Sequence, residues 1–92
     1  MKKYLINEKE YELIENFNEG FDETEVIAKL TEYFDLYDYV VGDWSYGKLR
    51  LKGFCDKENK IYKNINDINT KDTYIKESCS YGCRYFVLKK SV

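Results

Sequence analysis

Large apolar residues alternate with other side chains near the N-terminus of the chain. In residues 3–6 and again in residues 11–14, every second position carries one of a set of large apolar side chains: Tyr4, Ile6, Tyr11 and Leu13. A period of two is typical of a strand with one buried face. The polar residues Asn7 to Glu10 separate the two runs. The pattern predicts a first β-hairpin, with residues 16–21 forming the loop that leaves it.

The period of the pattern lengthens to between three and four after Asp22. Apolar residues recur at this spacing in a single stripe: Val26, Ile27, Leu30, Tyr33, Phe34 and Tyr37. This recurrence predicts one amphipathic helix of roughly Glu23 to Leu36, with the stripe facing the core. Asp22 can cap its first turn, and Glu25 three residues later completes a capping-box pattern.

Alternation returns between Tyr39 and Phe54, on either side of Ser45-Tyr46-Gly47. Gly47 can adopt a positive φ, so we expect a second hairpin with a three-residue turn and a bulge. Its second strand places Leu49 and Leu51 on one face and Lys48, Arg50, Lys52 and Phe54 on the other. Gly42 and Gly53 interrupt the strands, which indicates either bulges or another element close to the backbone.

The stretch from Cys55 to Asn69 is polar and predicts a mobile loop with one short strand at residues 60–63. Thr70 can cap a second helix from Lys71 to about Ser80, packed through Tyr74, Ile75 and Cys79, and Gly82 can end it. The apolar run in residues 85–89 is typical of a central strand buried on both faces. We therefore predict a single small α+β domain over residues 1–92, with a mostly antiparallel sheet, two helices and the order β-β-α-β-β-α-β.

The composition narrows the class of protein. In 92 residues, 43% are hydrophobic and 17% aromatic, which is enough to build a core and argues against disorder. No apolar run approaches the roughly 18 residues of a membrane span. No apolar segment follows the first lysines, so we expect no secretory signal and a cytoplasmic protein with reduced thiols.

The net charge of −2 is unevenly distributed along the chain. Residues 1–38 carry 4 lysines against 11 acidic residues, whereas residues 39–92 carry 11 basic residues against 6 acidic ones. One interpretation is that the two halves pack together and their charges offset. The other is that the second half presents a basic face to an anionic partner.

The cysteines do not form a recognisable metal or redox motif. A zinc site usually needs four Cys or His ligands, and the chain has three cysteines and no histidine. Cys79 and Cys83 flank Gly82 at the predicted end of a helix, where the negative end of the dipole disfavours a reactive thiolate. We interpret them as small packed side chains and expect no metal and no cofactor. A thiol-based sensor remains an alternative.

We expect no catalytic site. Asp38 and Asp43 are five residues apart, which places them on opposite faces of a regular strand, and Asp43 is positioned to pair with Arg50 or Lys52 across the hairpin. No histidine is present to activate a nucleophile, and no glycine-rich loop precedes a helix. An enzyme is therefore the less favoured class.

The second hairpin is the segment in which aromatic and basic residues are most concentrated. We select a candidate binding surface from it and from the last strand: Trp44, Tyr46, Lys48, Arg50, Lys52 and Arg84. It fits a solvated face, an interface with a protein partner, or a site for RNA or single-stranded DNA in which cations hold phosphates and rings stack on bases. The sequence pI of about 5.2 favours a protein over nucleic acid.

Two stretches of the chain, YDYVVGDWSYGKLRLKGF and SCSYGCRYFVLKK, resemble the signature segments of the YutD-like family, small proteins of low-GC Gram-positive bacteria. They cover about a third of the sequence, and the predicted order of elements extends the similarity. Ser45 stands where the family pattern has glycine, and Cys55 where it has an aromatic residue. The resemblance implies an α+β fold and a cytoplasmic protein, and it implies no particular activity.

Overall fold

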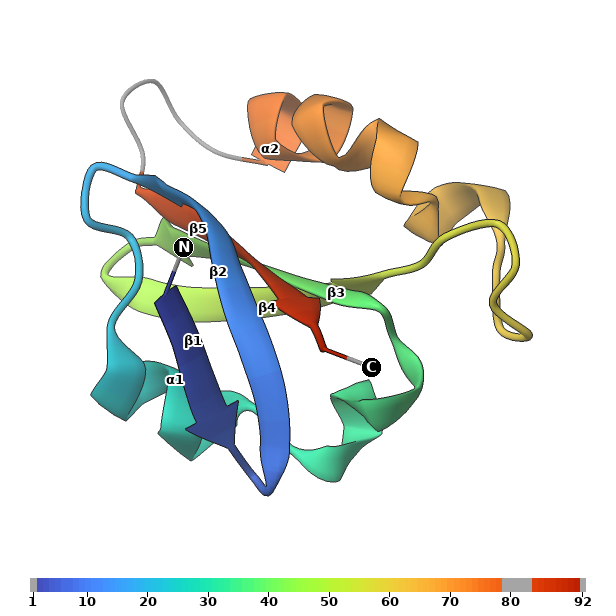
Figure 1. The fold of residues 1–92 in the computed structure, drawn as a ribbon. Coiled ribbons are helices and arrows are strands. Elements are labelled where there is room, and N and C mark those ends of the chain that lie inside the picture. The colour runs from blue at the N-terminus through green and yellow to red at the C-terminus, as the bar shows by residue number, and fades with distance from the viewer. Residues whose placement is uncertain (1, 79–83, 92) are drawn as a thin grey trace.

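Five strands form one antiparallel sheet in the order β1-β2-β5-β3-β4 (Figure 1). They are β1 Lys2–Ile6, β2 Lys9–Phe17, β3 Tyr39–Ser45, β4 Lys48–Phe54 and β5 Tyr85–Lys90. The structure, a computed structural model, describes residues 2–78 and 84–91. The predicted α+β class, the two hairpins and the central position of the last strand are confirmed.

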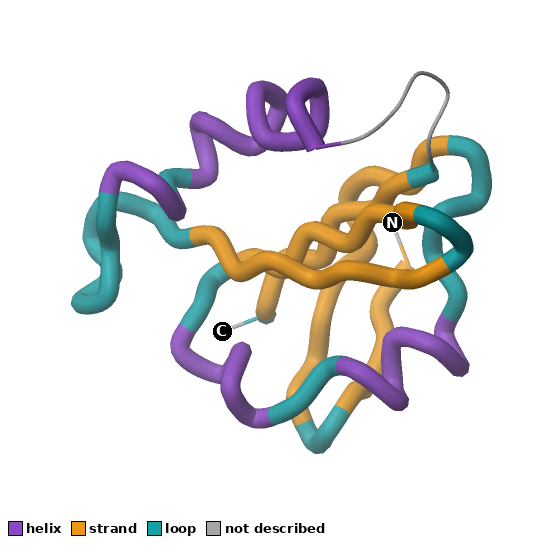
Figure 2. The backbone as a smooth tube through the Cα atoms, turned by 180° about the vertical axis from the view of Figure 1, so that it is seen from behind, coloured by secondary structure: helices purple, strands orange, loops and turns teal. Residues whose placement is uncertain are grey.

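Helices cover both faces of the sheet (Figures 1 and 2). Helix α1, Glu23–Lys29, and the 3-10 helix η1, Glu32–Leu36, lie on one face, and helix α2, Lys71–Ser78, lies on the other. The larger core lies between the sheet and α1–η1: Ile6, Tyr11, Val26, Leu30, Phe34, Val40, Leu49, Phe86 and Leu88. A smaller core under α2 contains Val41, Phe54 and Val87, with Tyr74 and Ile75 packed against it.

The first helix is shorter than the sequence predicts. The cap is as expected, because Asp22 Oδ1 accepts from the Glu25 N–H at 3.2 Å. However, α1 ends at Lys29, Leu30 is extended, and η1 begins only at Glu32. The Asn7 side chain donates to the Leu30 carbonyl and engages a group that a continuing helix would use.

This break changes which apolar residues are buried. Val26, Leu30 and Phe34 are buried as predicted. Ile27 is about half exposed and Tyr33 is largely exposed, so the prediction that Ile27 faces the core is wrong. The stripe is therefore narrower than a continuous helix would make it.

The turns and the end of β2 also differ from the prediction. Ser45 pairs with Lys48, so the second hairpin closes through two residues, Tyr46 and Gly47, with φ of 52° and 73°. Positive φ at both positions is the two-residue turn that matches strand twist, and the expected three-residue turn is wrong. Strand β2 continues to Phe17 after a register shift between Leu13 and Glu15, so the predicted loop starts later.

The two strand glycines mark close approach of aromatic rings. An ideal Cβ on Gly42 would lie 2.1 Å from the Phe86 ring, and one on Gly53 would lie 2.4 Å from the Tyr37 ring. Both contacts are too short for any side chain at these positions. Of the two readings that the sequence allows, close approach of another element is therefore the one observed.

The segment between β4 and α2 is built from short helical turns. The predicted strand at residues 60–63 is absent, and two 3-10 helices, η2 Asn64–Asn66 and η3 Ile68–Thr70, follow instead. The segment is tied to β4, because the Cys55 N–H donates to the Asn66 carbonyl at 2.7 Å and the Ile68 N–H donates to the Cys55 carbonyl at 3.0 Å. It therefore has a defined path along the end of β4.

The start of α2 also departs from the expected cap. Thr70 ends η3, and its hydroxyl donates to the Asp67 carbonyl at 2.7 Å. The predicted end of α2 near Ser80, with Cys79, Gly82 and Cys83, lies outside the described residues.

Leu30→Ala should lower the free energy of unfolding by about 2–5 kcal/mol, because Leu30 is buried at the centre of the larger core. Urea titration followed by circular dichroism measures this change. Ile27→Ala is the matched control on the same helix and should cost less than about 1 kcal/mol. Equal losses for the two variants would show that the break after Lys29 is misplaced.

Tyr62→Phe should raise the pKa of the Asp67 carboxyl. That pKa lies below its usual value because the carboxylate accepts from the Asn69 N–H at 2.8 Å and from the Tyr62 hydroxyl at 2.7 Å. NMR titration of the carboxyl carbon measures the shift. Tyr46→Phe, at a fully exposed tyrosine, is the control and should leave Asp67 unchanged.

The effect of Tyr62→Phe on the free energy of unfolding should also depend on pH. A pKa that is lower in the folded protein contributes stability above the unfolded pKa, about 4 for Asp, and this contribution is lost as the pH falls through the folded pKa. The destabilisation caused by Tyr62→Phe should therefore be larger at neutral pH than in acid. A difference that grows in acid would contradict the assignment.

Candidate protein-binding groove

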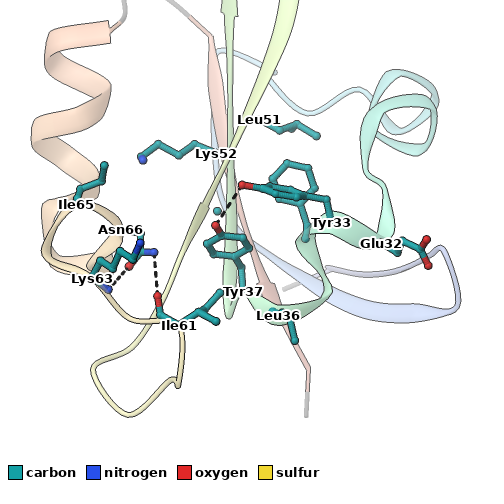
Figure 3. Close-up of a pocket in the computed structure, with 12 residues that line it drawn as sticks. Glu32, Tyr33, Leu36, Tyr37, Leu51, Lys52, Ile61, Lys63, Ile65 and Asn66 are labelled. Atoms are coloured by element: carbon teal, nitrogen blue, oxygen red, sulfur yellow. Dashed lines mark hydrogen bonds between the residues drawn. The ribbon is translucent and has the colours of Figure 1, made fainter.

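A groove of about 780 Å³ lies beside β4 (Figure 3). Its floor is β4 at Leu51–Gly53, one wall is η1, and the other is the segment 61–66. The side chains that line it come from these three parts of the chain and from Tyr37, which directly follows η1: Glu32, Tyr33, Phe34, Leu36, Tyr37, Leu51, Lys52, Ile61, Lys63, Ile65 and Asn66. We refer to this feature as the β4 groove.

The rim of the β4 groove is unusually apolar for an exposed surface. Tyr33 and Leu36 are each 66% exposed, and Ile65 on the opposite wall is 72% exposed. Scattered exposed apolar residues need no explanation, but apolar residues gathered around a hollow mark an interaction site. The β4 groove is therefore a candidate interaction site.

Two tyrosines form the aromatic wall of the groove. The Tyr33 and Tyr37 ring centroids are 5.8 Å apart, and their hydroxyls lie 3.4 Å apart. The hydrogen bond to Tyr33 raises the pKa of Tyr37 to about 12, with burial adding to the effect. Tyr37 is thus neutral throughout the physiological range. The wall offers an uncharged ring surface with hydroxyls at its edge.

Charges at the groove are separated by sign (Figure 3). Lys52 and Lys63 lie near the wall formed by segment 61–66, and Glu32 lies on the η1 side. The Lys52 ammonium is 5.2 Å from the Phe54 ring centroid and 5.6 Å from that of Tyr74. These rings hold the lysine on the α2 side of β4.

The six residues predicted as a binding surface do not form one continuous surface. Strand alternation puts Lys48, Arg50 and Lys52 on the α2 side of the sheet. Arg50 pairs with the fully buried Asp43 at 2.5 Å, as expected, and this contact raises the pKa of Arg50. Tyr46 is fully exposed at the tip of the turn.

Trp44 lies on the other side of the sheet and packs against the larger core. Its indole N–H donates to the Gly20 carbonyl at 2.7 Å, and the Arg84 guanidinium lies 4.2 Å from its ring centroid. The cation that reaches Trp44 is thus Arg84 and not Arg50 or Lys52. Of the predicted set, only Lys52 lines the β4 groove.

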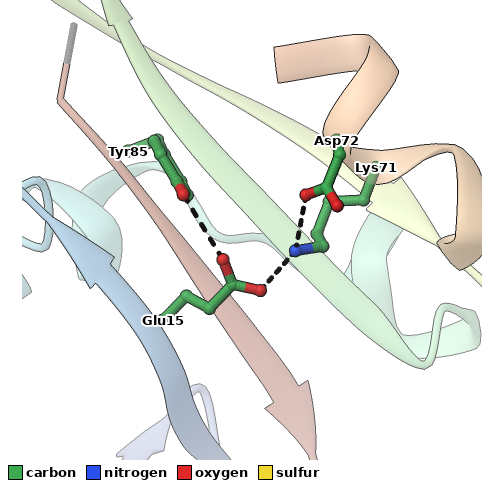
Figure 4. Close-up of polar contacts among 4 residues, drawn as sticks. All are labelled: Glu15, Lys71, Asp72 and Tyr85. Carbon is green, nitrogen blue, oxygen red and sulfur yellow. Dashed lines mark hydrogen bonds and ion pairs between the residues drawn. The ribbon is translucent and has the colours of Figure 1, made fainter. Parts of the chain in front are cut away.

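A cluster of polar groups attaches α2 to the sheet (Figure 4). The Lys71 ammonium pairs with Glu15 on β2 and with Asp72 at 3.1 Å, and the Tyr85 hydroxyl donates to Glu15 at 3.4 Å. Burial lowers the pKa of Lys71, but Glu15 and Asp72 outweigh it, and the pKa is raised above its usual value. The ammonium stays charged, and the cluster fixes α2 above β2 and β5.

The remaining candidate residues have structural partners. Asp38 accepts from the Asp56 N–H at 2.9 Å and from the Asn59 side chain at 3.1 Å. Cys55 is buried, and burial raises the pKa of its thiol. Within residues 2–78 and 84–91 no three His, Cys, Asp or Glu side chains are grouped to hold a metal ion.

Most of the residues that line the groove are not indicated as a site by the sequence pattern. The pattern predicts a buried helical stripe for Tyr33 and Tyr37, a short strand for Ile61 and a mobile loop for Ile65. The available signal is the three isoleucines, Ile61, Ile65 and Ile68, in an otherwise largely polar stretch, which a solvated loop does not require.

Comparison with known proteins identifies the family of the chain. The model of the YutD-like family, described as "Putative antitoxin YutD-like", matches residues 5–89. The chain is 49% identical over 86 residues to "Putative antitoxin YutD" of Bacillus subtilis (strain 168), covering 94% of each sequence. It also superposes on the solution NMR structure of protein yutD from B. subtilis with a TM-score of 0.82, at 46% identity, covering 99% of this chain and 83% of that one.

The resemblance inferred from the two signature segments is thereby confirmed over nearly the whole sequence. None of the helices in the described residues is long and apolar enough to cross a membrane. The chain belongs to the YutD-like family.

Proposed function

We propose that this protein is a cytoplasmic, non-enzymatic binding module, one domain over residues 1–92, that contacts a partner protein through the β4 groove. The observation that carries the proposal is the gathering of Tyr33, Leu36 and Ile65, each largely exposed, around a hollow of about 780 Å³. Aromatic and aliphatic side chains around a pocket are what concentrates binding energy in protein interfaces.

The relatives support a function in binding. The B. subtilis relative is named as an antitoxin, and an antitoxin acts on a toxin, so the name implies a partner molecule. At 49% identity over nearly the full length, the same kind of activity is the natural proposal for this chain. The absence of any grouped metal ligands in the described residues offers no support for a metalloenzyme.

Binding of RNA or single-stranded DNA through the second hairpin is the alternative, and the arrangement of side chains favours it less. Arg50 is engaged by Asp43, and Trp44 with Arg84 lies on the opposite side of the sheet from Lys48 and Lys52. Single-strand binders need cations and exposed rings along one strip. We therefore assign Lys52 to the protein-binding groove, whereas Lys48 lies beside the turn of the hairpin.

Leu36→Asp and Ile65→Asp should each weaken binding of the partner by roughly tenfold or more, since each places a charge in an apolar interface. A two-hybrid screen of the native proteome identifies the partner, and titration calorimetry with the purified pair measures the loss. Leu5→Asp is the matched control, because Leu5 is 73% exposed on β1, at the opposite edge of the sheet.

Three results would contradict the groove as the site. One is equal loss with Leu5→Asp, and the second is no loss with either groove variant. The third is capture of nucleic acid that Lys48→Glu abolishes and whose affinity falls steeply with salt, which would support the alternative.

A further inference from the structure

The backbone of β4 has a free edge at the floor of the groove. On β3, the Trp44 N–H donates to the Arg84 carbonyl at 3.2 Å, and just before β3 the Asp38 carbonyl accepts from the Lys90 N–H at 2.9 Å, while the Asp38 N–H donates to the Phe54 carbonyl of β4. Within β3, the register with β5 therefore directs the backbone groups of the even-numbered residues, Val40, Gly42 and Trp44, to β5. Because these groups alternate along a strand, the odd-numbered residues direct theirs to β4.

The register between β3 and β4 shows which backbone groups of β4 face β3 and which face away from the sheet. Val41 pairs with Lys52 and Asp43 with Arg50, so the even-numbered residues of β4 bond to β3. Leu51 and Gly53 must direct their N–H and C=O groups away from the sheet. Both residues line the groove, and neither has a backbone hydrogen-bond partner on this side among the described residues.

Cys55 shows that this edge can accept another segment. Two residues beyond Gly53, it directs its backbone groups the same way, and these bond to Asn66 and Ile68. The contact is a parallel bridge between Cys55 and Asp67. The chain therefore already adds its own backbone to the edge at one point. At the groove floor beside it, Leu51 is partly exposed and Gly53 is buried, and no described backbone group bonds to either residue on this side.

We propose that the β4 groove takes up an extended segment of the partner protein, which pairs with Leu51 and Gly53 as a sixth strand. This inference rests on the proposed function and specifies how the partner binds. Strand addition supplies affinity through main-chain hydrogen bonds and selectivity through the side chains on alternate positions.

The two sides of the groove define the chemistry of that segment. Side chains of an added strand alternate between the η1 side and the α2 side. On the η1 side they meet Tyr33, Leu36 and Tyr37, which suit apolar residues, and on the α2 side they meet Lys52 and Lys63, which suit acidic ones. The segment we infer thus alternates apolar and acidic residues.

A second copy of this chain fits the edge poorly. If β4 paired with its own copy, Lys48, Arg50 and Lys52 would face the same residues across the new ladder, because they share one face of the strand. Like charges opposite one another destabilise a strand pair. The same cations attract an acidic segment of a different protein.

The test is a titration of the full chain followed by amide NMR. The probe is an octapeptide of alternating valine and glutamate, compared with the same peptide carrying lysine in place of glutamate. With the glutamate peptide, the amide protons of Leu51 and Gly53 should shift and become at least tenfold slower to exchange, and those of Lys3 and Leu5 on the other edge should not change. Lys52→Glu should reverse the preference between the two peptides.

A backbone variant separates strand addition from simple side-chain binding. Leu51→Pro deletes the outward N–H and leaves the hydrogen bonds to β3 in place, so it should abolish binding of the glutamate peptide. Leu51→Ala keeps that N–H and should retain binding within a few-fold. Should the proline variant not fold, a glutamate peptide methylated on alternate backbone nitrogens tests the same bond from the other side, and it should bind at least tenfold more weakly.

The results also separate this inference from the proposed function. One result would overturn strand addition and leave the groove as the site. In it, Leu36→Asp no longer binds the partner protein, whereas Leu51→Pro still binds the glutamate peptide fully, or the unmodified chain still binds the methylated peptide fully. Protection of Leu51 and Gly53 without peptide, rising with protein concentration, would show that a second copy is the occupant and would overturn the inference. Failure of the groove variants to affect any partner would overturn the proposed function itself.

Discussion

The rest of the structure depends on the insertion of β5 between two hairpins that are complete before it in the sequence. Phe86, Val87 and Leu88 are wholly buried, and Gly42 lacks a side chain where the Phe86 ring crosses it. Phe86 and Leu88 belong to the larger core, and Val87 belongs to the smaller one, so this strand holds both layers of helix to the sheet. Neither half of the sheet can bury its inner edge until the end of the chain arrives, which makes the fold rich in non-local contacts.

The local spacing of apolar and polar residues is sufficient to predict most of the fold. Strand alternation predicted both hairpins, the capping residue Asp22 was correctly identified, and the apolar run in residues 85–89 indicated a central strand. The helix break could not be predicted, because it depends on a hydrogen bond between Asn7 and Leu30, which are 23 positions apart. The two-residue turn was missed because it puts the non-glycine Tyr46 at positive φ, where strand twist outweighs the local steric preference.

The candidate site was much less predictable than the fold. Cations and rings lie close together in the sequence of the second hairpin, but strand alternation places Trp44 and Lys52 on opposite sides of the sheet. The β4 groove needs three segments, of which one was assigned to a buried stripe and another to a loop. Leu36 and Ile65 form part of one site only because the fold brings η1 and segment 61–66 to the same edge of the sheet.

The two edges of the sheet are protected to different degrees. Edge strands invite pairing with other chains, and charged or covered edges resist it. Strand β1 is short and begins with Lys2 and Lys3. On strand β4, Leu49 and Gly53 are buried, Leu51 is partly exposed, and the backbone of Cys55 just beyond the strand is bonded to Asn66 and Ile68. The accessible part of the β4 edge is therefore short. Because η1 and segment 61–66 flank it, an incoming strand must make side-chain contacts as well as backbone hydrogen bonds. Such a short edge limits indiscriminate aggregation and favours recognition of one kind of segment.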